Sequence, residues 1–280
     1  MKKIKLLLII PFYVLILFFI LSNKNSEQKT YQDRDKLLII LSEFPPYINE
    51  QEEGNGFLIN IINTTFNRIG VDPEYKFYPW KRAERFIKSG KAFAALPYIS
   101  TEWTKENEQN YFVSEGIIPC QVKLFYYKKS KAYFNFNKIE DLSYYRIGVV
   151  SGYLFFYNEI FEKKGINNLF YSDEEGSALK QLVSGKVDLV PYAELHGWQL
   201  IKDLYSEKEK ELIKLSRTKT VVIKEKNFNV LDKSLSNSYI KLLVSKDFPN
   251  SKKILSRFNK ELDEVKKNGA LDLILNQFNN

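Results

Sequence analysis

The side chains best suited to bind a small molecule come directly after short strand-like runs of the sequence. Glu43 and Tyr47 follow the first of these runs, and the Glu43 carboxylate could receive an ammonium group. Trp80 follows a later run and offers a flat ring to an apolar or cationic group. The alternative roles are a solvated loop residue for Glu43 and a ring packed between loop and helix for Trp80. All three residues are candidate ligand contacts.

Two further runs also end in groups that form hydrogen bonds. Tyr98, Ser100 and Thr101 lie at the end of one run, where hydroxyl and backbone N–H groups could bind a carboxylate or a hydroxyl. Tyr192 and Glu194 follow the other run, and a polar lid over a cleft is their alternative role. These five residues join the candidate contacts.

A strand-to-helix turn supplies a different kind of binding group. Ser151, Gly152 and Tyr153 follow an apolar run and precede a predicted helix. The N–H groups at a helix N-terminus point outward and carry a partial positive charge, so they favour an anion. The turn therefore predicts a position that binds an anionic group of a ligand.

Residues that catalyse bond cleavage or hold metal ions are scarce. The chain has one cysteine, Cys120, and one histidine, His196, which excludes a Cys/His zinc site and an intramolecular disulfide. A Ser-His-Asp or Cys-His centre would need His196, and a lone histidine near a helix is more often structural. Phosphate-loop, nucleophile-elbow and zinc-protease motifs do not occur in the sequence. We therefore expect no catalytic residue, no metal and no cofactor.

The N-terminus has the layout of a secretory signal. Lys2, Lys3 and Lys5 precede an unbroken apolar run over residues 6–21, and polar residues follow at once. As a helix the run would span roughly 24 Å, less than a hydrocarbon core of ~30 Å, and Pro11 weakens a stable span. Residues 1–25 are therefore predicted to be a signal peptide that directs the protein to the periplasm. An uncleaved N-terminal anchor is the alternative, because no A-x-A-like cleavage site is evident.

The charge distribution argues against a nucleic-acid partner. The formal net charge is +8, and half of it falls within residues 1–25, which contain four lysines and no acid. In the rest of the chain basic and acidic residues alternate, whereas a nucleic-acid surface needs clustered Lys and Arg. Hydrophobic residues make up 44% of the chain, which is enough for an ordinary globular core.

Strands and helices are predicted to alternate after the targeting segment. Strands are expected over residues 36–42, 74–78 and 92–98. Amphipathic helices are expected between them, over residues 58–69 and 81–89, and a glycine follows each. This order favours an α/β fold with a largely parallel sheet.

The alternation restarts after residue 120. Later strands are predicted over residues 121–128, 145–150, 187–190 and 239–245. Ser172 and Glu175 have capping-box spacing and predict the start of a helix that ends at Gly185. Two C-terminal helices are predicted over residues 251–267 and 271–278. The restart indicates a second α/β region.

From Lys36 onward the order of features resembles the bacterial extracellular solute-binding proteins of family 3, which are type II periplasmic binding proteins. The segments that carry the resemblance are LLIILSEFPPYI, EGNGFLINIINTTFNRIG, FYPWKRAERFIKSGKAFAALPYISTEW, IEDLSYYRIGVVSGY, LKQLVSGKVDLV and FNKELDEVKKNGALDLIL. Each segment alone is a weak signal, but their common order over residues 36–278 makes the resemblance specific. Known members of the family largely bind polar amino acids for ABC importers.

The resemblance implies a two-lobed α/β fold, in which each lobe is a mostly parallel sheet flanked by helices. By resemblance, lobe 1 comprises residues 31–118 and 240–280, and lobe 2 comprises residues 119–239. The ligand cleft of such a fold lies between the lobes, at the carboxyl ends of strands, and closes by a hinge motion. The implied partners are a small polar ligand and an ABC transporter permease, and a monomer is expected.

The residues that bind an amino acid in this family are not matched here. Family members carry an arginine in the third-strand loop, where its fork binds the α-carboxylate, and Trp103 occupies that position and is a candidate contact. The family's ammonium-binding aspartate falls at Ala193. Arg82 on the second predicted helix or Lys105 could replace the missing arginine, although helix residues such as Arg82 usually face solvent. We therefore expect the ligand to differ from a standard α-amino acid.

Three kinds of function fit the resemblance. A solute receptor that captures an amino-acid-like or other small metabolite for an ABC importer is the main expectation. A ligand-sensing module of the same fold is the first alternative, and an uncleaved N-terminal anchor would favour it. A periplasmic dehydratase-like enzyme is the second alternative, but it would have to bind two carboxylates, which the missing arginine disfavours.

Overall fold

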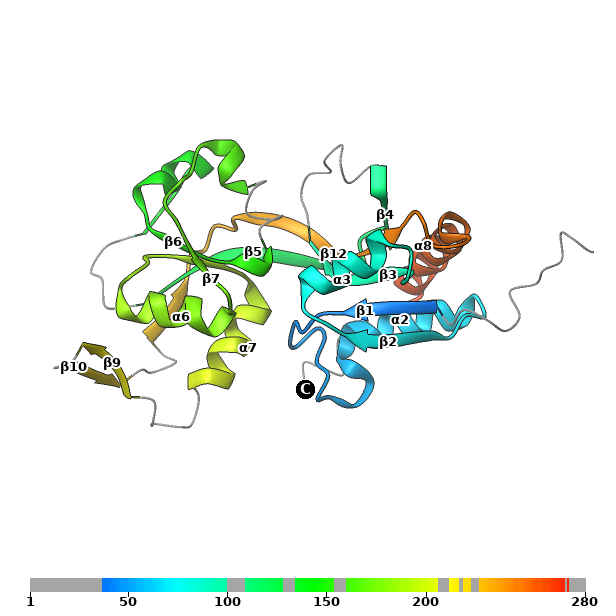
Figure 1. The fold of residues 1–280 in the computed structure, drawn as a ribbon, viewed down its shortest axis with the longest axis horizontal. Coiled ribbons are helices and arrows are strands. Elements are labelled where there is room, and N and C mark those ends of the chain that lie inside the picture. The colour runs from blue at the N-terminus through cyan, green and yellow to red at the C-terminus, as the bar shows by residue number, and fades with distance from the viewer. Residues whose placement is uncertain are drawn as a thin grey trace, which may run out of the picture. The chain divides into compact units, whose positions relative to one another are not determined.

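Two long strands connect two α/β lobes in the computed structural model of this chain (Figure 1). The structure describes residues 37–99, 109–127, 134–153, 160–205, 212–216, 219–222, 227–269 and 271. All of them belong to one unit, Leu37–Asn280. The mixed α/β fold predicted from the sequence is confirmed, whereas the predicted signal segment, residues 1–25, lies outside the described residues.

Lobe 1 is built on three parallel strands in the order β3–β1–β2. Their bounds are Leu37–Leu41 for β1, Pro73–Phe77 for β2 and Ala94–Tyr98 for β3. β1 pairs in parallel with both neighbours. It is apolar throughout because both of its faces are covered: Ile39 and Leu41 pack on one side of the sheet and Ile40 on the other.

Helices cover both faces of this sheet. α2 (Phe57–Arg68) and α8 (Ser251–Lys267) lie on one face, and α3 (Trp80–Lys88) lies on the other. Phe66 of α2 meets Phe258 of α8 with ring centroids 4.7 Å apart. Gly56 precedes α2 with φ of 94°, and a Cβ there would lie 2.6 Å from the Tyr47 carbonyl oxygen. Only glycine therefore fits at this start of α2.

The two connecting strands are β5 (Ile118–Tyr127) and β12 (Ser236–Ser245). They pair antiparallel from Ile118 opposite Ile240 to Val122 opposite Ser236. β12 continues into lobe 1, where it pairs with β3 and with β4 (Tyr111–Val113). β5 continues into lobe 2, where it pairs with β8 (Val190–Ala193) and β11 (Phe228–Val230). Each strand thus contributes to both lobes, while the residue limits predicted for the lobes stay a prediction.

Lobe 2 adds a second parallel pair and two helices. β6 (Ile147–Val150) pairs in parallel with β7 (Leu169–Ser172). α6 (Glu175–Ser184) and α7 (Glu194–Tyr205) pack against this lobe's core. Short 3₁₀ helices among the described residues include η2 (Ile139–Tyr144), η3 (Ser151–Tyr153) and η4 (Glu162–Lys164) in this lobe, and η1 (Glu53–Asn55) before α2 in lobe 1. β9 (Leu212–Ser216) and β10 (Lys219–Val222) pair antiparallel.

Some predicted elements differ from those of the structure. α8 occupies residues 251–267 as predicted, whereas the strand predicted over residues 187–190 lies at β8 instead. The predicted capping box at Ser172 is wrong, because α6 has Glu174 as its N-cap and no side-chain cap bond. After Ser151 the described residues form the short 3₁₀ turn η3. Residues 272–278 of the last predicted helix lie outside the described residues.

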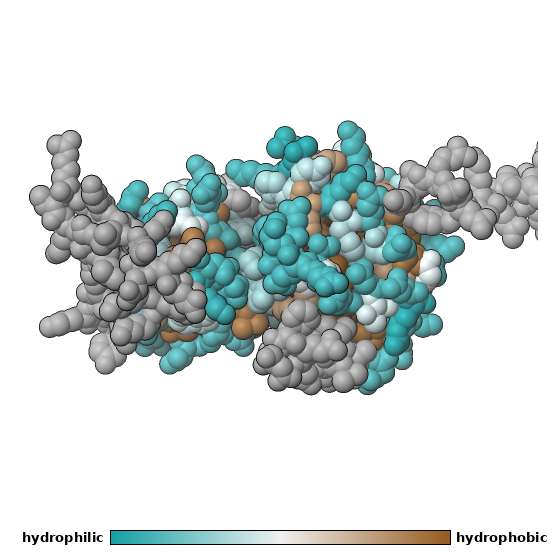
Figure 2. Space-filling model, turned by 90° about the horizontal axis from the view of Figure 1, so that it is seen from below, coloured by the Kyte–Doolittle hydropathy of each residue, from teal (hydrophilic) through white to brown (hydrophobic). Residues whose placement is uncertain are grey.

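Hydrophilic residues predominate on the face of the molecule seen from below, and smaller hydrophobic areas lie between them (Figure 2). Among the described residues, no helix has the length and apolar character needed to cross a membrane. The large hydrophobic side chains that are exposed include Tyr144, Tyr171, Leu195, Leu204 and Tyr239.

Candidate ligand-binding site

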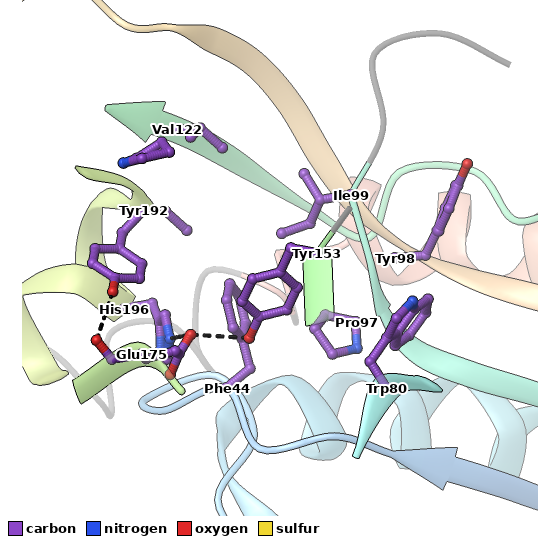
Figure 3. A pocket seen from close by; sticks show the side chains of 12 residues that line it. Phe44, Trp80, Pro97, Tyr98, Ile99, Val122, Tyr153, Glu175, Tyr192 and His196 are labelled. Atoms are coloured by element: carbon purple, nitrogen blue, oxygen red, sulfur yellow. Dashed lines mark hydrogen bonds and ion pairs between the residues drawn. The ribbon is translucent and has the colours of Figure 1, made fainter. Parts of the chain in front are cut away.

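A cavity lies between the two lobes, next to the connecting strand β5 (Figure 3). It holds about 640 Å³ of empty space, including the part open to solvent. Its walls come from the ends of β3 and β8, from the starts of α3, α6 and α7, and from the loop after β1. The lining residues are Phe44, Trp80, Pro97, Tyr98, Ile99, Val122, Tyr153, Glu175, Pro191, Tyr192, Ala193 and His196. Strand ends in α/β sheets commonly carry such sites.

The wall from lobe 1 is a set of rings and apolar side chains. Phe44 belongs to a tight loop after β1, where its backbone N–H and carbonyl both pair with Ile48. Tyr47 of the same loop stacks on Phe44, with centroids 5.2 Å apart, and is buried in the core of lobe 1. Trp80 opens α3, and Pro97 and Tyr98 end β3. Packing therefore fixes this wall without an ion pair between its lining residues.

The wall from lobe 2 is a network of hydrogen bonds centred on Glu175. The Tyr153 hydroxyl donates to Glu175 Oε1 at 2.9 Å, and the Tyr192 hydroxyl donates to the Glu175 carbonyl at 3.0 Å. His196 Nε2 lies 2.7 Å from the same Oε1. Glu175 is the first residue of α6, and the network thus joins η3, β8, α6 and α7 at the cavity (Figure 3).

His196 is the most enclosed polar group of the cavity, with 1% of its surface exposed. Its Nδ1 lies 2.7 Å from the carbonyl oxygen of Pro45, and its ring stacks on Phe44 with centroids 4.3 Å apart. Burial lowers the pKa of His196, but the charge and hydrogen bond of Glu175 outweigh burial, so the pKa is raised above 6.5. Burial raises the pKa of Glu175, but the His196 charge and the hydrogen bonds from His196 and Tyr153 leave it below 4.5. Each member of the pair therefore favours the charged form of the other.

A glycine lets α7 bring His196 to this position. A Cβ on Gly197 would lie 2.5 Å from Phe125 Cζ on β5 and 2.9 Å from Tyr192 Cβ on β8. The helix therefore packs closer to the two strands than any side chain at residue 197 would allow. This close approach places the neighbouring His196 against the loop after β1.

Four of the candidate contacts predicted from the sequence line the cavity: Trp80, Tyr98, Tyr153 and Tyr192. The structure places Ser151 and Gly152 in η3 next to Tyr153 but not among the lining residues. Ser100, Thr101 and Trp103 lie outside the described residues, as does Lys105. Ligand contact by these candidate residues stays a prediction.

Three other candidates have partners elsewhere in the protein. Tyr47 belongs to the core of lobe 1, where burial raises the pKa of its hydroxyl. Glu43 is exposed and accepts a hydrogen bond from the Glu50 N–H at 2.9 Å, and partial burial of its carboxyl raises its pKa. Glu194 forms an ion pair with Lys123, with 3.0 Å between Oε2 and Nζ. In the structure none of the three is among the residues that line the cavity.

The sequence reasoning missed Glu175, His196 and Phe44 as cavity residues. Glu175 was interpreted as a helix cap and His196 as a structural histidine. His196 nevertheless lies in the first turn of α7, just after β8, close to the strand end that led to Tyr192 and Glu194. Phe44 lies between the two candidates chosen on its loop, Glu43 and Tyr47. Strand-end position was thus a signal for both His196 and Phe44.

Arginine and lysine side chains are not found in the described walls of the cavity. Arg82 and Arg85 are exposed on α3, and the Arg82 guanidinium lies 4.2 Å from the centroid of the Tyr78 ring. Within the described part of the chain, no group of three His, Cys, Asp or Glu residues is placed to hold a metal ion.

Fold and cavity together place this chain among two-lobed ligand-binding proteins. The chain belongs to the bacterial extracellular solute-binding proteins, family 3, whose pattern matches residues 38–280. Among curated protein sequences, none matches this chain. The sequence resemblance and the fold predicted from it are therefore confirmed.

Solved structures of the same fold include binding proteins and sensor domains. The GluR0 ligand-binding core from Nostoc punctiforme in complex with L-glutamate aligns with a TM-score of 0.61 at 18% identity, over 86% of this chain and 98% of that chain. An ancestral arginine-binding protein bound to arginine aligns with a TM-score of 0.62 at 20% identity, over 87% and 98%. A histidine kinase sensor domain aligns with a TM-score of 0.66 at 16% identity, over 88% and 97%. At these identities the likeness concerns the fold.

Proposed function

We propose that this protein is a periplasmic receptor that captures a small polar metabolite in the interlobe cavity and delivers it to an ABC importer. The observation that carries the proposal is the cavity itself, which both lobes line and which includes Trp80 and Tyr98 from one lobe and Tyr153 and Tyr192 from the other. A ligand that contacts both lobes favours their closed arrangement. Binding and release need no catalytic group, so we propose a receptor rather than an enzyme.

We further propose that the ligand is not a standard α-amino acid. An α-carboxylate enclosed in a poorly hydrated cavity needs strong donors, and an arginine fork is the best single source of them. The described cavity walls contain no arginine or lysine, and the His196 nitrogens already face Pro45 and Glu175. Within the class of small polar metabolites, the aromatic walls favour one that carries a ring or an apolar portion and few charged groups.

A thermal-shift screen against small metabolites tests the receptor function. A true ligand present at 100 times its Kd adds about 2.7 kcal/mol to the free energy of unfolding. Small-angle scattering with the same ligand is expected to show compaction. A chain that no metabolite stabilises, and that stays rigid in solution, would contradict the receptor function.

Calorimetry with the twenty standard amino acids tests the ligand class separately. We expect weak binding or none for each of them. Sub-micromolar binding of any one would overturn this part of the proposal. It would leave the receptor function intact. It would also indicate that Lys105, Arg82 or the turn at Ser151–Tyr153 binds the carboxylate in place of the arginine of family members.

A ligand-sensing module is the second candidate, because a histidine kinase sensor domain shares the fold. The two candidates differ in the fate of residues 1–25. Cell fractionation and mass spectrometry of the protein from its native host are expected to show an exported chain without this segment. An intact segment in the membrane fraction would favour sensing, and an intact chain in the cytosol would contradict export.

A further inference from the structure

His196 belongs to lobe 2 and contacts lobe 1 in two ways. Its Nδ1 lies 2.7 Å from the Pro45 carbonyl oxygen, and its ring stacks on Phe44 at 4.3 Å. Pro45 and Phe44 belong to the loop after β1, whereas His196 lies in the first turn of α7. The side chain therefore bridges the two lobes at the wall of the cavity (Figure 3).

Both ring nitrogens of His196 face oxygen atoms that accept hydrogen bonds. A carbonyl oxygen can only accept, so Nδ1 must carry a proton to bond with Pro45. A carboxylate likewise only accepts, so Nε2 must carry a proton to bond with Glu175 at 2.7 Å. The neutral imidazole has a single N–H and can satisfy one of the two partners, whereas the imidazolium satisfies both.

We propose that His196, as the imidazolium, holds the two lobes closed by donating one N–H to Pro45 of the other lobe while Glu175 accepts a hydrogen bond from its second N–H. On deprotonation the remaining N–H stays with the charged Glu175 carboxylate, because charge-assisted hydrogen bonds are stronger than neutral ones. The lone pair of Nδ1 then faces the Pro45 carbonyl oxygen, and the bond between the lobes is lost. Closure over the cavity is therefore coupled to one proton.

The groups around His196 favour the protonated state. Glu175 approaches from α6, and Glu43 in the loop after β1 is close enough that His196 affects its pKa. Asp203, further along α7, adds to the raised pKa of His196. Glu194 of α7 is already paired with Lys123 of β5. Tyr153 of η3 and Tyr192 of β8 are further titratable neighbours in the described part of the chain, and their hydroxyls bond to Glu175.

The direction of the pH effect follows from the raised pKa of His196. The bond between the lobes is complete at pH values below the ordinary histidine pKa of 6.5 and is lost as pH rises through the higher value in the closed protein. The closed arrangement, and with it the affinity for the proposed ligand, is expected to fall over the same range. The inference deepens the proposed function but concerns closure, which can be measured without a ligand.

His196 is the only histidine of the chain, so its protonation can be followed directly. The full chain, produced without a histidine tag and with ¹⁵N-histidine, is expected to show one imidazole with both nitrogens protonated at pH 6. Its titration midpoint should lie above 6.5, and Glu175→Gln should move the midpoint to lower pH. A neutral ring at pH 6, or a midpoint unchanged in Glu175→Gln, would overturn the proposal.

Closure is measured by the distance between spin labels on the two lobes. Lys88 of α3 and Lys180 of α6 are exposed and can be replaced by cysteine, whereas the native Cys120 is buried. Between pH 6 and pH 9 we expect the wild-type distance distribution to shift toward longer distances. A control pair within lobe 1, at Lys88 and Lys252, should not change.

The variant His196→Phe keeps a ring against Phe44 but has no N–H. It is expected to stay at the longer distances at every pH. In this variant the Glu175 carboxylate loses its partner, which could impair folding. The double variant His196→Phe/Glu175→Gln removes that carboxylate and is expected to give the same longer distances at every pH. A pH shift that persists in the variant, or a wild-type distance that does not respond to pH, would overturn the proposal. A protein that gives either result could still bind a metabolite in the thermal-shift screen. Failure of the proton-coupled closure is therefore distinguishable from failure of the proposed receptor function.

Discussion

The two walls of the cavity are built by different means. Lobe 1 contributes Phe44, Trp80 and Ile99, which packing holds in place, whereas lobe 2 contributes Glu175 and His196 within a hydrogen-bonded network. An apolar wall gains affinity from contact area and tolerates small changes of shape. A network in which each donor has one acceptor has a fixed geometry, and loss of one member leaves the others unsatisfied. For the proposed ligand we therefore expect lobe 1 to supply buried contact area, and lobe 2 to supply orientation and the control of closure.

The largest expected effect concerns the network of lobe 2. Glu175→Gln removes the counterion of a buried imidazolium, and we expect it to lower the free energy of unfolding by about 2 kcal/mol at pH 6. The raised pKa of His196 stabilises the fold below pH 6.5 and ceases to do so as pH rises through its folded value, so the cost should shrink toward pH 9. The lowered pKa of Glu175 stabilises the fold above pH 4.5, so the cost should also shrink in acid.

Urea unfolding at pH 4, 6 and 9 measures this cost. Glu174→Gln is the matched control, because the neighbouring Glu174 is exposed and its side chain forms no cap bond. The control should change the free energy of unfolding by less than about 0.5 kcal/mol. An equal cost for both variants, or a cost at Glu175 that does not depend on pH, would contradict the ion pair.

The second prediction concerns the ring wall of lobe 1. Trp80→Ala is expected to weaken binding of a ligand found in the screen at least tenfold, which corresponds to about 1.4 kcal/mol, and to leave the fold intact. Calorimetry measures the affinity. Phe86→Ala on the same helix is the control, because Phe86 stacks on Tyr78 and does not line the cavity. Unchanged affinity in Trp80→Ala would show that the ring only packs between loop and helix.

A smaller effect is expected from one hydroxyl of the network. Tyr192→Phe removes the bond to the Glu175 carbonyl, and we expect a loss of about 1 kcal/mol in the free energy of unfolding. Tyr144→Phe should change nothing, because Tyr144 is 87% exposed. Thermal unfolding of both variants makes the comparison. A loss no larger than that of Tyr144→Phe would mean that the hydroxyl is not part of a cooperative network.

The smallest expected effect tests whether lobe 1 lacks a charged contact altogether. Arg82 is exposed and its guanidinium lies over the Tyr78 ring, so Arg82→Ala should leave the ligand affinity within about twofold. Calorimetry with the ligand used for Trp80→Ala compares the affinities of Arg82→Ala and the wild-type protein. A tenfold loss would show that Arg82 turns into the cavity and replaces the arginine of related proteins.

Elements with a strong apolar pattern could be predicted from the sequence. The run at β1 and the periodic residues of α8 determine their own structure, because each must bury one or both faces. The strand predicted over residues 187–190 overlaps β8 only at Val190. Val187 and Leu189 are buried although they precede β8, so their apolar character alone does not locate the strand. The residues that pair with β5 begin at Val190, and this pairing selects the strand. Pairing between segments far apart in the chain is not visible in local periodicity.

The site could be predicted only in part, for a similar reason. The residue types and strand-end positions of Trp80, Tyr98, Tyr153 and Tyr192 were sufficient to place them at the cavity. Capping-box spacing at Glu175 describes a carboxylate that turns back to its own helix, whereas this carboxylate bonds to His196 on the next helix. Nothing within a few residues of either side chain distinguishes the two outcomes, because their contact depends on how α6 and α7 pack.

The path of β12 has a consequence for the order in which the protein can assemble during synthesis. β12 joins the sheet of lobe 1 beside β3, and α8 covers that sheet together with α2. A chain that has emerged only as far as α7 contains β1, β2 and β3 but lacks the strand and the helix that complete the lobe. Lobe 1 therefore begins first and finishes last, and until residue 262 has emerged the apolar face of α2 lacks its partners Phe258 and Leu262.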